Sequence, residues 1–312
     1  MEGFQQAAPG RHQPSRYSKT MNQENASAEI SLILPAKNEA KALKTLLPAL
    51  RRILPDAEII VVDDGSGDGT GDVAASLGAR VIRHPYSMGN GAAIKSGARA
   101  ARGKTLVFMD ADGQHDPDDI PRLLARFRRG YKMVVGARHP GSHASWPRRF
   151  ANHFYNRLAS RMTGFNIEDL TSGFRAADAE CFRKFLYLLP NGFSYPTTST
   201  MAFFRAGFPV AYEPIHAGKR EKGSSSHIRL LRDGLRFFLI ILKIGTLFSP
   251  MRLFLPVSAL IFATGLAYYG YTYWMWHKLT NMSVILFLGS LFVFMMGIVS
   301  EQISSLHYRF HE

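Results

Sequence analysis

The chain has 312 residues, of which 46% are hydrophobic, and it carries a formal net charge of +14. This length suits one large domain with an appendage, or two domains, and the charge indicates an anionic partner such as a nucleic acid, a nucleotide or an acidic lipid. The single cysteine, Cys181, excludes a fold held together by internal disulfides, and we expect this residue to pack as a small apolar side chain.

Residues 1–28 are polar and lack an apolar core. A secretory signal peptide requires such a core, so we expect a disordered lead-in here instead. From residue 29 onward, short apolar runs predict strands over residues 30–34, 58–62, 79–83, 106–109, 131–136 and 208–214. The stretches between them predict helices over residues 38–53, 89–102 and 117–129, and a mainly helical region over residues 146–207. This alternation predicts an α/β fold with a mostly parallel, doubly wound sheet.

Two carboxylates directly follow the predicted strand 106–109. Asp110 and Asp112 lie at its carboxyl end, where an open α/β sheet binds its ligands, and Gln114 adds a neutral oxygen on the same turn. Such oxygens can bind a hard divalent cation that keeps positions free for phosphate. The alternative is a polar loop in which Asp116 caps the helix that begins at Pro117. Asp116 suits that role, but two neighbouring like charges suit a cap poorly, which favours a metal site at Asp110 and Asp112.

A second acidic pair, Asp63 and Asp64, ends the predicted strand 58–62. The pair could accept hydrogen bonds from a base or a ribose, or one aspartate could cap the glycine-rich turn that follows, and both interpretations stay open. A dehydrogenase is disfavoured, because Thr70 and Ile94 occupy the last glycine position of the two G-x-G stretches. Small residues at positions 89 and 91–93 would let a helix start approach a nucleotide closely.

A basic, amphipathic stretch covers residues 219–250. Arg229, Arg236 and Lys243 are seven residues apart and would share one helix face, while leucine and phenylalanine fill much of the remainder. This pattern is typical of a helix that lies in a membrane interface with its basic groups toward anionic headgroups. A solvated surface helix is the alternative.

Two long apolar segments follow, over residues 253–274 and 282–300, and neither contains a charged residue. Each approaches the roughly 20 residues that cross a bilayer, and tyrosine and tryptophan gather at the end of the first segment as in an interfacial belt. A buried core hairpin would need a larger surrounding domain than the chain provides. Because the basic excess precedes the first segment, the positive-inside rule predicts a membrane protein with two spans, and with the large domain and both termini in the cytoplasm.

Four motifs, in this order, carry a resemblance to a known family: LPAKNE at 34–39, VDDGS at 62–66, GNGAA at 89–93 and MDADGQH at 109–115. In combination they resemble family 2 glycosyltransferases of the GT-A fold, within the branch of dolichol-phosphate mannose synthases and bacterial polyprenyl-phosphate glycosyltransferases. The segments GAR at 136–138 and DLTSGFR at 169–175, and the closing apolar pair with EQIS at 301–304, also match that branch. The resemblance covers about residues 29–306.

The resemblance implies a set of site residues at the positions that match the family's motifs. The residues that would hold the nucleotide are Pro35, Lys37, Glu39, Asp63, Asp64 and Gly89, with Arg138 and Arg220 on phosphates. The residues that would bind Mg²⁺ or Mn²⁺ against the diphosphate are Asp110, Asp112 and Gln114. The predicted catalytic residues are Asp110, Asp112, Asp169 near the acceptor, and Arg220.

One segment departs from the family, which usually shows a Ser-Lys pair shortly after a basic residue and a glycine. Here Arg220-Glu-Lys-Gly223 is followed by three serines and His227, so no lysine lies in the expected place. The acceptor phosphate would therefore be contacted by Arg220, with Lys222, His227 or Arg229 in place of the missing lysine.

The expected organisation has four parts. They are a disordered segment (1–28), a GT-A catalytic domain (29–218), a basic loop with an amphipathic interfacial helix (219–250), and a two-helix transmembrane hairpin with a short tail (251–312). The implied function is inverting, metal-dependent transfer of one sugar from a GDP- or UDP-sugar to undecaprenyl or dolichyl phosphate at the cytoplasmic membrane face. The partners would be the donor, the lipid acceptor and the bilayer, without nucleic acid, and a homo-oligomer stays open.

Three other functions fit parts of the sequence. A processive polysaccharide synthase shares the fold, but it normally has more spans and a Gln-x-x-Arg-Trp segment that this chain lacks. A nucleotidyltransferase would have a glycine-rich, arginine-containing loop where this chain has PAKNE at 35–39. A membrane-tethered nucleic-acid binder would explain the charge of +14, but the basic residues cluster beside the spans and no groove-reading motif is evident.

Overall fold

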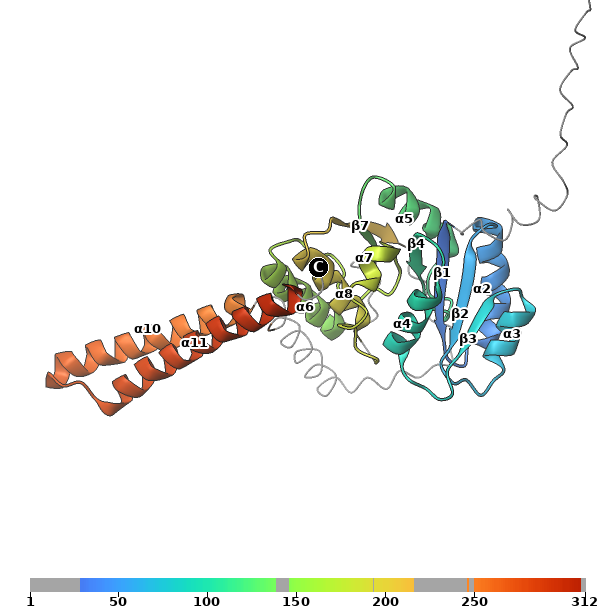
Figure 1. Ribbon diagram of the computed structural model, residues 1–312. Coiled ribbons are helices and arrows are strands. Elements are labelled where there is room, and N and C mark those ends of the chain that lie inside the picture. Colours follow the sequence, from blue (N-terminus) through green and yellow to red (C-terminus); the bar gives the residue numbers. More distant parts are fainter. Residues whose placement is uncertain (1–28, 139–145, 193, 216–245, 247–249, 310–312) are drawn as a thin grey trace, which may run out of the picture.

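The computed structural model describes residues 29–138, 146–192, 194–215, 246 and 250–309. These residues form an α/β domain and a long helical hairpin that projects away from it (Figure 1). The predicted lead-in over residues 1–28 and nearly all of the predicted interfacial helix over 219–250 lie outside the described residues, so both stay predictions.

Seven strands form one sheet in the order β3-β2-β1-β4-β6-β5-β7. Their bounds are β1 Ile30–Ala36, β2 Glu58–Asp63, β3 Arg80–Arg83, β4 Thr105–Phe108, β5 Met133–Arg138, β6 Arg175–Asp178 and β7 Val210–Ile215. Neighbouring strands are parallel except where β6 pairs antiparallel with β4 and with β5. The predicted mostly parallel sheet is confirmed, and the predicted strands differ from the observed ones only at their ends.

Helices cover both faces of this sheet. The helices on one face are α2 Ala40–Ile53, α3 Thr70–Ser76 and α5 Ile120–Phe127; those on the other are α4 Asn90–Ala100, α6 Trp146–Thr163, α7 Ala179–Arg183 and α8 Tyr195–Arg205. Alternate residues of each strand feed the two cores, because side chains along a strand point to opposite faces. In β1, Leu32 and Leu34 pack with α2, while Ile33 packs with α4. Burial on both faces explains why the strands read as continuous apolar runs.

Strand β6 corrects the expectation of a mainly helical region over residues 146–207. Its four residues, Arg-Ala-Ala-Asp, include no β-branched or aromatic side chain, so strand propensity does not indicate it. Ala176 and Ala177 are fully buried between β4 and β5, and this tertiary setting makes the segment a strand. Cys181, in the helix that follows, is buried as expected.

The predicted helix over residues 117–129 begins as a short 3₁₀ turn, Pro117–Asp119, before α5. Asp116 caps this turn, since its side chain accepts a hydrogen bond from the N–H of Asp118. The capping role expected for Asp116 is confirmed, and it separates this residue from Asp110 and Asp112, which precede the turn.

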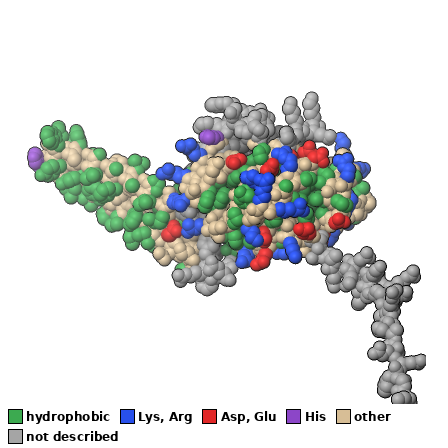
Figure 2. Space-filling view, turned by 90° about the horizontal axis from the view of Figure 1, so that it is seen from above, with side chains coloured by type: hydrophobic (Ala, Val, Ile, Leu, Met, Phe, Trp, Pro, Cys, Tyr) green, Lys and Arg blue, Asp and Glu red, His purple; other side chains and the backbone are tan. Residues whose placement is uncertain are grey.

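Two helices form the hairpin: α10 Pro250–Trp276 and α11 Asn281–Arg309. Each contains a window long and apolar enough to cross a membrane, with mean hydropathies of 1.6 and 2.5, and only 11% and 17% of those windows are buried. The alternative of a buried core hairpin is therefore wrong. Figure 2 shows apolar side chains spread over the outside of the hairpin. The two predicted spans correspond to these two helices.

Candidate functional site

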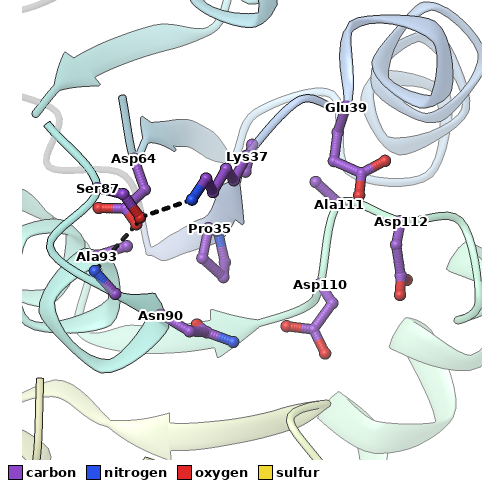
Figure 3. A pocket seen from close by; sticks show the side chains of 12 residues that line it. Pro35, Lys37, Glu39, Asp64, Ser87, Asn90, Ala93, Asp110, Ala111 and Asp112 are labelled. Atoms are coloured by element: carbon purple, nitrogen blue, oxygen red, sulfur yellow. Dashed lines mark hydrogen bonds between the residues drawn. The ribbon is translucent and has the colours of Figure 1, made fainter. Parts of the chain in front are cut away.

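A cavity of about 360 Å³ lies at the carboxyl ends of β1, β2 and β4 (Figure 3). This is the edge at which open α/β sheets bind their ligands. All four motifs that carry the family resemblance contribute to its lining, and Ser87 adds one residue from outside them. The lining residues are Pro35, Ala36, Lys37, Glu39, Asp64, Ser87, Gly89, Asn90, Ala93, Asp110, Ala111 and Asp112. The topology therefore gathers segments that are far apart in the sequence into one site.

Asp110 reaches the cavity from the end of β4. Its neighbour Met109 is still buried and hydrogen-bonded to β1, so the backbone at residue 110 is held firmly. Oδ2 of Asp110 lies 3.8 Å from Nε2 of His115, and the His115 ring stacks on Phe174. Burial acts to raise the pKa of Asp110, but His115 and Asn90 outweigh it and hold the pKa below its ordinary value. Asp110 is therefore ionised at neutral pH.

Asp112 lines the same cavity, and its Oδ1 accepts the N–H of Gln114 at 3.1 Å, which closes a tight turn. In the view of Figure 3, the carboxylates of Asp110 and Asp112 extend to the same side of the segment that carries them. Gln114 is not among the lining residues. The structure thus brings two of the three predicted metal ligands to the cavity.

Two carboxylates fit a divalent cation that takes its other ligands from a diphosphate and from water. Within the described part of the chain, no cluster of three or more His, Cys, Asp or Glu side chains could hold an ion. Mg²⁺ is usually bound through one or two carboxylates plus substrate phosphates rather than by an all-protein cage. The oxygen donors at residues 110 and 112 match that pattern.

Asp64 anchors the loop that forms the opposite wall. Its Oδ1 accepts hydrogen bonds from Nδ1 of His84 and the N–H of Met88, both at 2.8 Å. Its Oδ2 accepts from Oγ of Ser87 at 2.8 Å and from the N–H of Gly89 at 2.9 Å. Burial acts to raise the pKa of Asp64, but these hydrogen bonds outweigh it and hold the pKa below its ordinary value. The Asp64 carboxylate therefore shapes the cavity as an ionised, fully bonded acceptor.

Asp63 has a different place. Its Oδ1 accepts the N–H of Ser66 at 2.9 Å, and the residue does not line the cavity. Of the two interpretations that the sequence leaves open for this pair, the structure shows Asp63 in the turn-capping role. The nucleotide contact expected for Asp63 stays a prediction.

Pro35, Lys37 and Glu39 line the cavity, as the resemblance implies. Lys37 reaches across to Ser87, with Nζ 2.9 Å from Oγ, and Ser87 in turn donates to Asp64 (Figure 3). Lys37 thus places a positive charge inside a cavity that also contains carboxylates, and this charge attracts an anionic ligand such as a diphosphate.

The start of α4 is partly occupied by protein backbone. The N–H groups of Gly91 and Ala92 donate to carbonyls of the loop 190–192, at 3.2 and 2.8 Å. A Cβ at Gly91 would overlap the carbonyl oxygen of Pro190. The small residue at 91 therefore admits this loop rather than a nucleotide, which corrects the expectation for that position. Gly89, with φ of 101°, lines the cavity, and its contact with a nucleotide stays a prediction.

Arg138 and Asp169 form an ion pair. Nε and Nη2 of Arg138 donate to Oδ2 and Oδ1 of Asp169 at 2.8 and 3.1 Å, and Nη2 also donates to Oγ1 of Thr171 at 2.6 Å. Burial acts to raise the pKa of Asp169, but Arg138 outweighs it and holds the pKa below its ordinary value. Neither member of the pair lines the cavity. Their expected contacts with phosphate and acceptor stay predictions, as do those of Arg220, Lys222, His227 and Arg229, which lie outside the described residues.

Sequence patterns missed several residues that hold the motifs together. His84 and Ser87 lie between β3 and α4, and Asn90 is the first residue of α4; these side chains bind Asp64 or line the cavity. Their place in the site could have been predicted, because they follow a predicted strand at the same sheet edge as the two acidic pairs.

Arg175, which ends a motif of the resemblance, lies fully buried behind the cavity. Its Nη1 donates to Oγ of Ser199 at 2.7 Å, and its Nη2 donates to the carbonyl of Ser172. Gly173, two residues before Arg175, packs against Asp110, since a Cβ there would lie 2.9 Å from Oδ2. Arg175 therefore supports the segment that backs Asp110, a role that no local pattern indicates.

Family models match both parts of the chain. The model described as Glycosyl transferase family 2 matches residues 31–186, which is half of the 312 residues. The model described as GtrB C-terminal hairpin matches residues 249–306, which include α10 and most of α11.

The chain is also similar to individual proteins. Undecaprenyl-phosphate mannosyltransferase of Micrococcus luteus is 34% identical over 209 residues, which cover 62% of this chain and 85% of the relative. Polyprenol monophosphomannose synthase of Mycolicibacterium smegmatis is 32% identical over 217 residues, which cover 64% and 82%. The crystal structure of glucosyl-3-phosphoglycerate synthase from Mycobacterium tuberculosis, in complex with Mn²⁺ and UDP-glucose, superposes with a TM-score of 0.55 at 22% identity, over 74% of this chain and 84% of that one. This last likeness concerns the fold.

Proposed function

The chain belongs to glycosyl transferase family 2 and is a glycosyltransferase, and we propose that it transfers one sugar from a nucleotide-sugar to the phosphate of a polyprenyl lipid. One observation carries the proposal: Asp110, Asp112 and Lys37 line one cavity in a chain that ends in an exposed apolar hairpin. The two relatives are named for undecaprenyl phosphate and polyprenol monophosphomannose, which supports a lipid phosphate as the acceptor.

The donor is a GDP- or UDP-sugar. The cavity of about 360 Å³ has the size of a small-molecule site, and its mixture of a lysine with acidic side chains suits a nucleoside diphosphate shared with a cation. The structural neighbour from M. tuberculosis, crystallised with UDP-glucose and Mn²⁺, supports this class of donor. Lys37 would contact the donor's phosphates, and it would give up its bond to Ser87 to do so.

Asp110 and Asp112 are the residues that would hold Mg²⁺ or Mn²⁺. When bound, the ion supplies positive charge next to the departing nucleoside diphosphate and so stabilises the negative charge that develops there. Lys37 adds a second positive charge from the opposite side of the cavity. Arg138 would add a third if it contacts phosphate while it stays paired with Asp169.

The reaction is a single in-line displacement. An oxygen of the lipid phosphate attacks the anomeric carbon of the sugar, the bond from that carbon to the diphosphate breaks, and the electron pair leaves with the diphosphate, so the configuration inverts. A lipid phosphate is already ionised, which makes a strong general base unnecessary. Asp169 fits this scheme, because Arg138 holds it as an anion that positions the guanidinium rather than as a base.

Chemistry takes place on the cytoplasmic side of the membrane, and the two hairpin helices are the spans. The connection between the spans holds only His277 and Lys278 as basic residues, whereas the basic excess precedes α10. The positive-inside rule then supports cytoplasmic termini and a cytoplasmic catalytic domain. Such an arrangement brings the lipid phosphate to the cavity by proximity.

The test is a donor panel. Membranes that contain the protein are incubated with radiolabelled GDP- and UDP-sugars, and the lipid fraction is extracted and separated. We expect one donor to label a lipid that carries a single sugar, with the label lost in EDTA and restored by Mg²⁺ or Mn²⁺. A labelled polymer would identify a polysaccharide synthase instead, and an absence of labelled lipid with every donor would refute the proposed acceptor.

A further inference from the structure

A second cavity lies where the catalytic domain meets the hairpin. It measures about 430 Å³, and it shares no lining residue with the donor cavity. Its lining residues are Arg161 near the end of α6, and Met251, Arg252, Leu255, Pro256 and Ala259 on the first turns of α10. No acidic residue lines it, so two guanidinium groups and an apolar wall define its chemistry.

Arg252 is held in place by the protein. Its Nη1 donates to the carbonyls of Met162 and Arg161, at 2.9 and 3.4 Å, at the end of α6. Gly164, with φ of 82°, leaves room for the guanidinium, because a Cβ there would lie 3.0 Å from Nη1. These partners are neutral carbonyls, so the positive charge of Arg252 is not paired with a carboxylate among the described residues.

Arg161 supplies the second positive charge. Within the described part of the chain, no hydrogen bond or ion pair engages its guanidinium. The acidic residue on the hairpin side, Glu301, pairs with Arg205 at 3.2 Å and accepts the N–H of Met251. Glu301 is therefore engaged elsewhere, and the two arginines of the cavity are available to an anion.

The apolar wall runs toward the membrane-facing surface. Met251, Leu255 and Ala259 are four residues apart on α10 and so lie on one stripe of the helix. Leu255 is 47% exposed, and the stripe leads into the exposed apolar surface of the hairpin. A free phosphate would leave this wall in contact with water, whereas a lipid would cover it.

We propose that this cavity binds the phosphate headgroup of an anionic bilayer phospholipid, with the phosphate at Arg161 and Arg252 and one acyl chain along the 251–255–259 stripe. A pair of cations at the start of a membrane helix attracts anionic headgroups. The site is independent of the sugar-transfer reaction and requires only that the hairpin enters a bilayer.

The test measures phospholipid binding by native mass spectrometry of the full-length protein in detergent, titrated with phosphatidylglycerol. We expect Arg161→Gln to weaken binding roughly fivefold, since one arginine near an anionic lipid surface contributes on that scale. Arg252→Gln should weaken it at least as much, and Arg252→Lys, which keeps the charge, should retain most of it. Arg157→Gln, an exposed arginine on the same helix that does not line the cavity, should bind as the wild type does.

Two results would overturn the proposal. Equal affinity in the wild type, Arg161→Gln and Arg157→Gln would show that the arginines form no headgroup site, and Arg161→Gln keeps this arm valid if Arg252→Gln fails to fold. Displacement of phosphatidylglycerol by farnesyl phosphate, together with a raised KM for the lipid acceptor in Arg161→Gln, would assign the cavity to the acceptor instead. Displacement by neither farnesyl phosphate nor inorganic phosphate supports the proposal, and none of the binding readouts depends on transfer activity.

Discussion

Asp110 and Asp112 face the same cavity, yet the protein holds them differently. Asp110 is backed by Gly173 and by His115, while Asp112 belongs to a tight turn closed by Gln114. Both side chains reach the cavity because they leave β4 one residue apart on the same side. Their oxygens are thus available together for a cation and a diphosphate.

Asp110→Asn and Asp112→Asn should each lower the rate of sugar transfer by about 100-fold or more, because each removes a negative ligand from the cation that stabilises the leaving group. The measurement is the initial rate of lipid labelling in membranes at saturating donor. The matched control is Asp118→Asn, an exposed aspartate on the same segment, which should transfer at the wild-type rate. Wild-type rates in both site variants would remove the two aspartates from the reaction.

Asp64 should make folding stability depend on pH. Its pKa is lower in the folded protein than in the unfolded chain, so protonation favours unfolding. Its contribution is therefore complete above the ordinary aspartate pKa of about 4 and is lost as the pH falls below that value. Asp64→Asn should cost about 2–3 kcal/mol at neutral pH, because two donors then face an amide NH₂.

The pH dependence of this stabilisation by Asp64 is measured by urea unfolding of the detergent-solubilised protein. Unfolding is followed by circular dichroism from pH 7 to pH 3. The difference in the free energy of unfolding between the wild type and Asp64→Asn should shrink as the solution becomes acidic. A difference that stays constant across this range would show that the hydrogen bonds to Asp64 are not those of an ionised carboxylate.

Part of the site could be predicted at the residue scale. Asp110 and Asp112 are recognisable because they directly follow a buried strand. The roles of Asp63 and Asp64 cannot be told apart from sequence, since neighbouring residues at a strand end point to opposite sides. Only the folded structure shows that Asp64 meets the loop after β3. The pair of Arg138 with Asp169 spans 31 residues and depends on how β5 lies beside β6.

Among the elements, α4 shows how a glycine-rich helix start can serve packing as well as binding. Its first turn accepts the backbone of the loop 190–192, which fixes the wall of the cavity that carries Gly89 and Asn90. The motif alone suggests room for a nucleotide along this whole turn. The loop 190–192, which binds the N–H groups of Gly91 and Ala92, comes from a part of the sequence with no recognisable pattern.

Gly91→Ala should destabilise the domain by about 1–3 kcal/mol, because the added methyl group overlaps the Pro190 carbonyl and overpacking costs this much. The same change at Gly67, where a Cβ meets nothing within 4 Å, should leave stability nearly unchanged. Thermal unfolding of both variants, with donor affinity as a second readout, checks the prediction. Equal stability of Gly91→Ala and Gly67→Ala would contradict the packing seen at this helix start.

Most elements were predictable because apolar runs and helical periodicity are local signals. Strand β6 was not, since its residues become a strand only when β4 and β5 flank them. This strand matters for the site, because it places Arg175 and the preceding Gly173 behind Asp110.

For the whole molecule, two polar contacts among the described residues join the hairpin to the catalytic domain: Arg205 at the end of α8 pairs with Glu301, and Arg252 caps α6. Within the hairpin, Glu301 also accepts the otherwise unpaired N–H of Met251. The apolar segments can be predicted from the sequence. These contacts cannot, because they join residues about 50 to 96 positions apart. They keep the donor cavity in a defined position relative to the hairpin.

Topology can be tested with introduced cysteines, because the native Cys181 is buried and should react little. Lys278→Cys, between the two spans, should react with a membrane-impermeant maleimide added to intact spheroplasts. Arg129→Cys, at an exposed position just after the end of α5, should react only after the membrane is opened. The reverse pattern would place the catalytic domain outside the cytoplasm.

The proposed transfer of one sugar to a lipid phosphate is tested most directly by measuring the stoichiometry of the reaction. The purified protein is reconstituted into liposomes that contain polyprenyl phosphate. Nucleoside diphosphate released and single-sugar lipid formed are measured in the same sample, with the donor found in the panel. We expect one lipid-linked sugar for each diphosphate released. Diphosphate release accompanied by free sugar or by polymer, without the single-sugar lipid, would contradict it.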